Sequence, residues 1–205
     1  MRKLLLFPLA VVLLSLATGC NSPAPTDSKP AATAATTDTA SLYRPTSTIK
    51  DIMDSEVDPS ADYMWDAVAT IISSKGIEER QPRTPKEWAE IRRRAVTLVE
   101  ATNLLVMPGR TVARPGEKSE NPGIELSPEE INAILEKDRD TFVKHAHTLN
   151  DAASLMLKAI DEKNIMGISD AGAAIDEACE SCHLIYWYPN EGKDRGGAGA
   201  PSLRK

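Results

Sequence analysis

The 205-residue sequence predicts an all-α protein built on an antiparallel four-helix bundle. In four separate segments, apolar residues recur at spacings of three and four, which is the pattern of helices that bury one face. No segment shows the sustained alternation of apolar and polar residues that marks a half-buried strand. Four such helices within the length of one ordinary domain favour a bundle in which each helix packs against its neighbours.

Residues 1–19 are predicted to be a signal peptide. Two basic residues precede an apolar run, Leu4–Leu16, that is shorter than the roughly 20 residues of a membrane-spanning helix. Small residues then lead to Cys20 as in a lipoprotein signal, although the leucine usual three places before the cysteine is missing. We expect export and lipidation at Cys20, and ordinary signal-peptidase cleavage nearby is the alternative.

The rest of the chain divides into a linker, one domain and a tail. Residues 20–44 are rich in Ala, Thr and Pro with few large apolar side chains, which predicts a flexible linker. Residues 190–205 are rich in Gly and charge and are expected to be a disordered tail. Residues 45–189 remain as a single domain of common size.

The first two helices are predicted over about 47–74 and from Thr84 to Pro108-Gly109. Asp58-Pro59 is expected to kink or restart the first helix. The second opens with a capping box, in which Glu87 follows Thr84 by three residues. The apolar positions are Ile49, Met53, Val57, Met64, Val68 and Ile71 in the first helix and Trp88, Ile91, Ala95, Leu98, Thr102 and Leu105 in the second.

The last two helices follow the long loop 110–126. The third is predicted from Ser127, at a second capping box, to about Asn164, and the fourth starts near Ser169. The inward positions are Ile131, Leu135, Asp138, Phe142, His145, Leu149, Ala152, Met156 and Ala159 in the third helix and Ala171, Ile175, Ala178, Cys182 and Ile185 in the fourth.

Cys179-Glu180-Ser181-Cys182-His183 is a C-x-x-C-H sequence, the attachment signature of c-type haem. Two thiols at this spacing can reach the two vinyl groups of one porphyrin, and His183 then offers an imidazole nitrogen to the iron. One covalently attached haem c is therefore the predicted cofactor. A large flat cofactor would also explain why only 4% of the residues are aromatic.

Other interpretations of the motif fit the sequence less well. A redox-active C-x-x-C usually opens a helix after a strand, whereas this one lies near the end of the last predicted helix. A zinc site would lack a clear fourth ligand, because the third cysteine is the predicted lipidation site Cys20. A disulfide between Cys179 and Cys182 would be strained and would close a very short loop.

A four-helix bundle with one C-x-x-C-H near its C-terminus resembles the class II c-type cytochromes, the cytochrome c′ and cytochrome c-556 group. The resemblance covers the layout of residues 45–189 and is sharp at Cys179, Cys182 and His183. It implies that His183 is the proximal iron ligand and that a residue of the first helix meets the distal face. In low-spin members that residue is Met, whereas five-coordinate members bind small gases. The Asp58-Pro59 break and the loop 110–126 depart from the family pattern.

Met53, Met64 and His145 are the candidate distal ligands. The two methionines are eleven residues apart, about 16 Å along a continuous helix, so only one can reach a given iron. Counting along an antiparallel bundle from one end favours Met53, and counting from the other end favours Met64; we expect Met53 to be the ligand, with Met64 and His145 as the alternatives. His145 lies on the seam of the third helix and would give bis-histidine ligation; the alternatives are a hydrogen bond to a haem propionate or a structural position at the edge of the bundle. Each of the methionines could equally be a core residue.

Several neighbouring residues are weaker candidates. Tyr186 and Trp187 follow the motif and are expected to pack on or beside the porphyrin. His147 is expected to be exposed. The run Arg92–Arg94 is expected to be a solvated helix face, with pairing to a haem propionate as the alternative.

The sequence therefore predicts a monohaem cytochrome that carries single electrons in the periplasm, tethered to a bacterial membrane by lipid on Cys20. Its partners would be redox proteins, and the resemblance also allows a homodimer. A net charge of −6 argues against nucleic acid, which binds basic surfaces. We find no catalytic residues. The alternatives are a five-coordinate haem protein that binds or senses NO or CO, and a thiol–disulfide oxidoreductase that uses Cys179 and Cys182.

Overall fold

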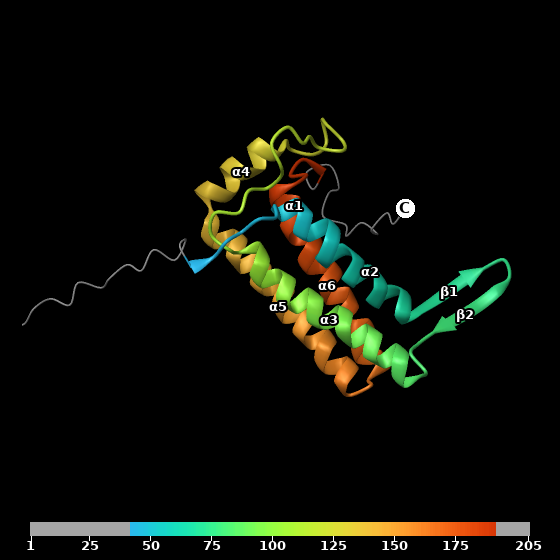
Figure 1. Ribbon diagram of the computed structural model, residues 1–205. Helices are drawn as coiled ribbons and strands as arrows, with labels where there is room; N and C mark the ends of the chain where they lie inside the picture. The colour runs from blue at the N-terminus through green and yellow to red at the C-terminus, as the bar shows by residue number, and fades with distance from the viewer. Residues whose placement is uncertain (1–41, 192–205) are drawn as a thin grey trace, which may run out of the picture. The chain divides into compact units, whose positions relative to one another are not determined.

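The computed structural model describes residues 42–191, which are mostly helical (Figure 1). The predicted signal peptide and Cys20 lie outside the described residues, as do nearly all of the predicted linker and tail. In chain order the elements are α1 (Ile49–Ile52), the π-helical segment η2 (Met53–Val57), α2 (Asp58–Ala67), β1 (Ala69–Ser73), β2 (Gly76–Arg80), α3 (Pro85–Leu105), α4 (Pro128–Lys137), α5 (Arg139–Asp161) and α6 (Ile165–Tyr186). The predicted helical class is confirmed, but the small sheet departs from an all-α fold.

The first predicted helix is wrong in its last part, because the helix ends at Ala67 and a β-hairpin follows. β1 and β2 pair antiparallel, with Ile72 opposite Ile77. β-branched residues favour extended backbone, and Gly76 at the turn has a φ of 121° that suits glycine. The hairpin projects from the helices, so both isoleucines of this pair are exposed (Figure 1). Ile71, expected on a helical face, lies in β1.

A π-helical turn precedes the predicted kink at Asp58-Pro59. α1 opens with a capping box, in which the Thr48 and Asp51 side chains each accept a hydrogen bond from the other's backbone amide. The amide of Asp58 donates to the carbonyl of Met53, five residues earlier. Pro59 has no N–H to donate and lies in the first turn of α2, where a proline is tolerated. The π-helical turn spans Met53–Val57 and ends directly before Asp58.

Both capping boxes predicted from the sequence, at Thr84 and Ser127, are present. The single helix predicted after Ser127 is instead two helices, α4 and α5. The backbone of Asp138 leaves the helical conformation, and its carboxylate accepts a hydrogen bond from the amide of Thr141. Asp138 therefore caps α5 and does not lie in the apolar seam where we expected it.

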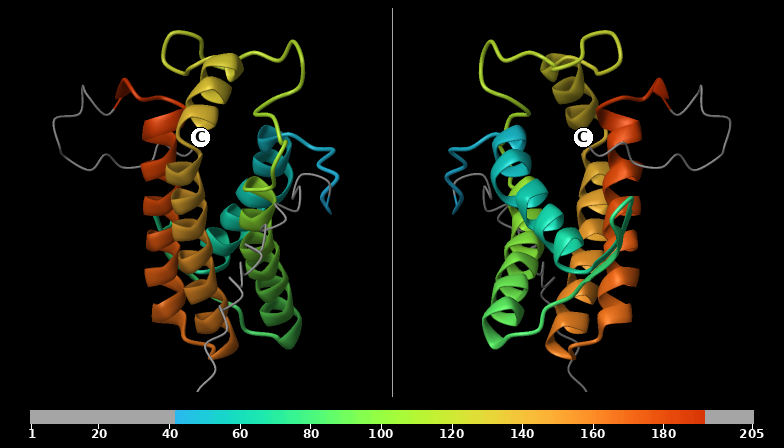
Figure 2. Two further views of the ribbon diagram at one scale, coloured as in Figure 1. Left: turned by 90° about the vertical axis from the view of Figure 1, so that its left-hand side faces the viewer. Right: turned by 90° about the vertical axis from the view of Figure 1, so that its right-hand side faces the viewer.

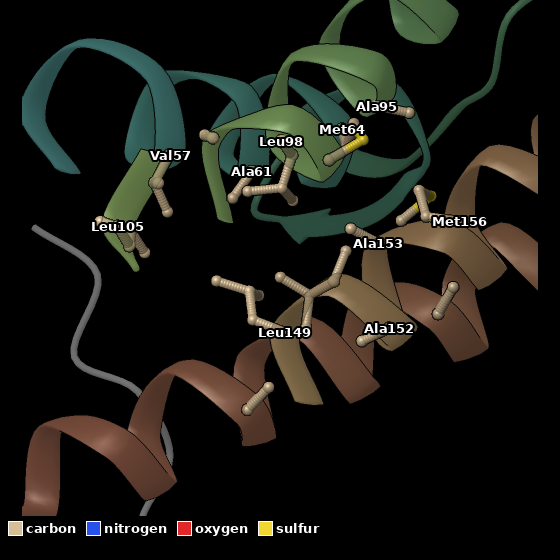
Figure 3. Close-up of a cluster of buried hydrophobic side chains, with 14 of the residues drawn as sticks. Val57, Ala61, Met64, Ala95, Leu98, Leu105, Leu149, Ala152, Ala153 and Met156 are labelled. Atoms are coloured by element: carbon tan, nitrogen blue, oxygen red, sulfur yellow. The ribbon is translucent and has the colours of Figure 1, made fainter. Parts of the chain in front are cut away.

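α2, α3, α5 and α6 all contribute side chains to one apolar core (Figures 2 and 3). α3 contacts α2 and α5, while α6 contacts α5 and α2. Most predicted inward positions are buried, among them Ile91, Ala95, Leu98, Leu105, Phe142, Leu149, Ala152, Met156, Ile175 and Ala178. Ile185 was predicted wrongly, since it is 40% exposed. No helix within residues 42–191 is long and apolar enough to cross a membrane.

Candidate functional site

The C-x-x-C-H motif lies near the C-terminal end of α6 and borders a cavity of about 270 Å³. Cys179, Cys182 and His183 all line this cavity, because residues three and four apart on a helix share a face. Both cysteines are half-buried free thiols. α6 therefore presents two thiols and one imidazole together to the same space.

A second wall of this cavity comes from η2 and α2, which contribute Met53, Val57, Ala61 and Trp65. The indole Nε1 of Trp65 donates a hydrogen bond to the carbonyl of Gly172 on α6 at 3.1 Å. A Cβ atom at position 172 would lie 3.2 Å from Cδ1 of Trp65, so glycine allows the close approach. This contact fixes α2, and the wall that it carries, against the helix that bears the motif.

A smaller cavity, of about 100 Å³, adjoins the first. Met53, Phe142, Cys182 and His183 line both cavities, whereas Cys179 lines only the larger. Residues of α4 and of the loop 110–126 complete the smaller cavity. The two cavities therefore lie on either side of a shared set of side chains that includes the motif histidine.

The long loop 110–126 forms part of this site. The amides at the start of α1 donate to the carbonyls of Thr111 and Val112, each at 2.9 Å. At the other end of the loop, the amide of Leu126 donates to the carbonyl of Trp187 at 2.8 Å. This role was not predictable from the sequence, because the Gly, Pro and charge content of the loop indicates irregular backbone but not which residues that backbone covers.

The three candidate distal ligands occupy different places. Met53 lines both cavities and His145 lines the larger one. Met64 is 1% exposed, packs in the apolar core and lines neither cavity. The Nδ1 atom of His145 lies 3.4 Å from Oγ of Ser181, within the motif. Met53 and His145 are therefore the two candidates that share a cavity with His183.

Aromatic side chains surround the end of α6. The His183 ring meets the edges of Trp187 and Tyr188, with centroids 5.0 and 5.9 Å away. The ring of Tyr186 instead meets the rings of Phe142 and His145 edge-on, with centroids 5.7 and 6.2 Å away. Tyr186 and Trp187 both line the smaller cavity, next to His183.

The basic run on α3 lies away from both cavities. Arg92 pairs with Asp161 at 2.7 Å, and Arg93 and Arg94 both pair with Glu90. None of the three arginines lines either cavity. His147 is likewise exposed. These residues form a solvated surface, as the sequence analysis expected.

Burial determines the protonation state of the motif. It raises the pKa of both Cys179 and Cys182 to about 12, and for Cys179 the nearby Asp58 carboxylate adds to the effect. Burial also lowers the pKa of His183. At neutral pH the site therefore contains two protonated thiols and a neutral imidazole, whose free nitrogen lone pair can bind a metal.

Carboxylates line the larger cavity on both α2 and α6, at Asp58, Asp62, Asp176 and Glu180. Burial, together with the carboxylates of Asp54 and Asp62, raises the pKa of Asp58 to about 6. Between pH 4 and pH 6 the folded state then binds more protons at Asp58 than the unfolded state does, so stability falls as the pH rises through this window.

We expect Asp58→Asn to remove part of this pH dependence. The wild type should lose stability relative to the variant between pH 4 and pH 6, and the difference should level off above pH 7. Urea unfolding midpoints measured from pH 4 to pH 8 test this, with Asp170→Asn on the exposed surface of α6 as the control. A variant whose stability follows that of the wild type across the whole range would contradict it.

Comparisons with protein-family models, with curated proteins and with solved structures find no match to this chain. Within residues 42–191, no three His, Cys, Asp or Glu side chains gather to form a site for a bare metal ion.

Proposed function

We propose that this protein is a monohaem c-type cytochrome that carries single electrons on the periplasmic side of a bacterial membrane. One observation carries the proposal: both thiols and the imidazole of the C-x-x-C-H motif border a single cavity, which Met53 also lines. A haem bound there would supply the one-electron change of its iron. The chain itself would supply attachment, axial ligation and a largely apolar pocket.

The residues around the cavities fit a covalently attached haem. Cys179 and Cys182 are free and protonated, the state in which each thiol can add across a vinyl double bond. In that addition a bond forms between sulfur and carbon, and the thiol hydrogen goes to the other vinyl carbon, so no oxidant is needed. His183 offers a neutral nitrogen as the proximal ligand. Trp187 and Tyr188 hold its ring from one side.

Met53 is our proposed distal ligand. It lines both cavities together with His183, and it stands at the start of the π-helical turn η2. Single π-helical turns occur frequently at functional sites, because they shift a side chain relative to the regular helical register. A thioether ligand opposite His183 would give a low-spin iron suited to electron transfer.

A thiol–disulfide oxidoreductase is less well supported. Such enzymes need a thiolate at physiological pH, and their reactive cysteine has a lowered pKa, often at a helix N-terminus. Here burial raises the pKa of both thiols to about 12, and the motif lies near the C-terminal end of a 22-residue helix. Both features oppose formation of the nucleophile.

We further propose that α2, α3, α5 and α6 form an antiparallel four-helix bundle that holds the haem beside α6. The ring of contacts, in which each helix touches two others, supports this. Within this set of four, each helix also runs opposite to the one before it (Figure 1). Export and a lipid anchor on Cys20 belong to the same proposal and rest on the sequence of residues 1–20.

The absorption spectrum of the purified holoprotein tests electron transfer against gas binding. We expect a low-spin spectrum in the reduced state that does not change when CO is added, because Met53 would occupy the sixth position. A high-spin reduced spectrum that shifts with CO would contradict the electron-transfer role and support a protein that binds or senses a small gas.

A further inference from the structure

Tyr186 has a buried hydroxyl group without a hydrogen-bond partner in the described part of the chain. Its side chain is 4% exposed and lines the smaller cavity. A buried hydroxyl without a hydrogen bond destabilises the folded state, and native proteins seldom contain one. Phenylalanine would fill the same space without leaving a buried hydroxyl unsatisfied. We therefore expect the hydroxyl to form a hydrogen bond with a group outside the described residues.

The smaller cavity also has a cation at its border. Lys118, from the loop 110–126, lines it and takes part in no ion pair among residues 42–191. Lys50, the other lysine of the lining, is already paired with Asp54 at 2.7 Å and with Glu120 at 3.5 Å. The cavity is otherwise mainly apolar, so one hydroxyl donor and one cation remain available for an acidic group.

The other ionisable groups near this cavity set its charge. The ionisable residues that line it are Lys50, Asp54, Lys118, Glu120, Glu125 and His183. The carboxylate of Asp138 does not line the cavity but influences the pKa of Tyr186. Burial, followed by Asp138 and Cys182, raises the pKa of Tyr186. The phenol therefore keeps its proton at neutral pH and acts as a donor.

We propose that Tyr186 and Lys118 bind a carboxylate of the haem in the smaller cavity. This rests on the proposed function and adds the residues that orient the cofactor. In haem the two carboxylates lie on the edge opposite the groups that join the cysteines. Cys179 lines the larger cavity but not the smaller one. The edge of the haem that joins the cysteines therefore belongs on the side of the larger cavity, and the edge that carries the carboxylates belongs on the side of the smaller cavity.

The two residues would act in different ways. The hydroxyl of Tyr186 donates a hydrogen bond to one carboxylate oxygen, which satisfies both buried groups at once. The ammonium group of Lys118 neutralises the charge, because a carboxylate in a largely apolar cavity is costly without a cation. Together they would fix the rotation of the ring about the His183 axis. Both are positioning residues and neither is an iron ligand.

Infrared difference spectra of the holoprotein, recorded between its oxidised and reduced states, test the proposal. We expect Tyr186→Phe and Lys118→Gln each to shift the carboxylate bands of the haem. Lys118→Gln should also lower the reduction potential, because it removes a positive charge that favours the reduced iron. Tyr43→Phe and Lys75→Gln, on exposed residues that line neither cavity, should change none of these readings.

The outcomes separate this inference from the proposed function. Carboxylate bands that stay unchanged in Tyr186→Phe, in a protein that still contains covalent haem, would overturn the inference and leave the cytochrome proposal intact. A wild-type protein with no covalent haem would overturn the proposed function itself. Because the change from Tyr to Phe only removes a hydroxyl that has no partner in the chain, the variant should fold.

Discussion

The double variant Cys179→Ala, Cys182→Ala is expected to contain no covalent haem and to lose most of its cooperative unfolding. Without the thioethers, no covalent bond joins the cofactor to α6, and haem held only by His183 can be removed. The cavity of about 270 Å³ would then lack its cofactor, and at about 24 cal/mol per Å³ a cavity of this size costs roughly 6 kcal/mol. Typical domains have only about 5–15 kcal/mol of stability. Urea unfolding followed by circular dichroism measures the effect.

The control for this prediction is the wild-type chain prepared without haem. If the cofactor completes the core, the haem-free wild type and the double variant should unfold alike, both with shallow transitions. A haem-free chain that unfolds as steeply as the holoprotein would show that the core is complete without a cofactor. Either cysteine replaced alone should leave one thioether and an intermediate stability.

Met53→Ala is expected to convert the iron from low spin to high spin. Met53 lines both cavities together with His183, and alanine at this position would leave no sulfur to bind the sixth position. The variant should also acquire a spectral response to CO, and its reduction potential should fall, because a thioether ligand favours the reduced iron. Absorption spectra with and without CO measure the change directly.

Met64→Ala and His145→Ala are the matched controls for Met53→Ala. Met64 lies in the core away from the cavities, so its replacement should reduce stability by about 2–5 kcal/mol and leave the spin state unchanged. His145→Ala should also remain low spin. A change of spin state with His145→Ala alone would instead identify bis-histidine ligation, and no change with any of the three would indicate a five-coordinate iron.

The helical seams and their caps were predictable because they depend on local spacing. Thr84 and Ser127 signal their helix starts through a glutamate three residues later, and the seam of α3 from Ile91 to Leu105 is buried as the periodicity indicates. The placement of the motif on one face of α6 follows in the same way, since three- and four-residue spacings define that face.

The hairpin and the break at Asp138 were not predictable from the same periodicity. Met64, Val68 and Ile71 fit a helical stripe, but the β-branched run before the turn at Gly76 favours strands once the packing on α3 ends. Asp138 fits a seam position by spacing, yet its carboxylate caps the next helix. In both cases a local backbone preference outweighs the hydrophobic pattern.

The composition of the site was only partly visible in the sequence. The motif indicated Cys179, Cys182 and His183, and counting along the helices gave Met53 as the expected distal ligand without excluding Met64. In the structure Met64 is buried in the core, whereas Met53 lines both cavities. Lys118 carried no signal, because a lysine in a long polar loop looks the same whether or not it borders a cavity.

The mass of the purified, denatured wild-type protein tests the central claim most directly. The chain should be expressed with its signal peptide in a bacterium that attaches c-type haem. We predict a mass that exceeds that of the processed chain by one entire haem, since addition of a thiol to a vinyl group loses no atoms, and Cys179→Ala, Cys182→Ala should lack this increment. A wild-type mass without the haem increment would contradict the account.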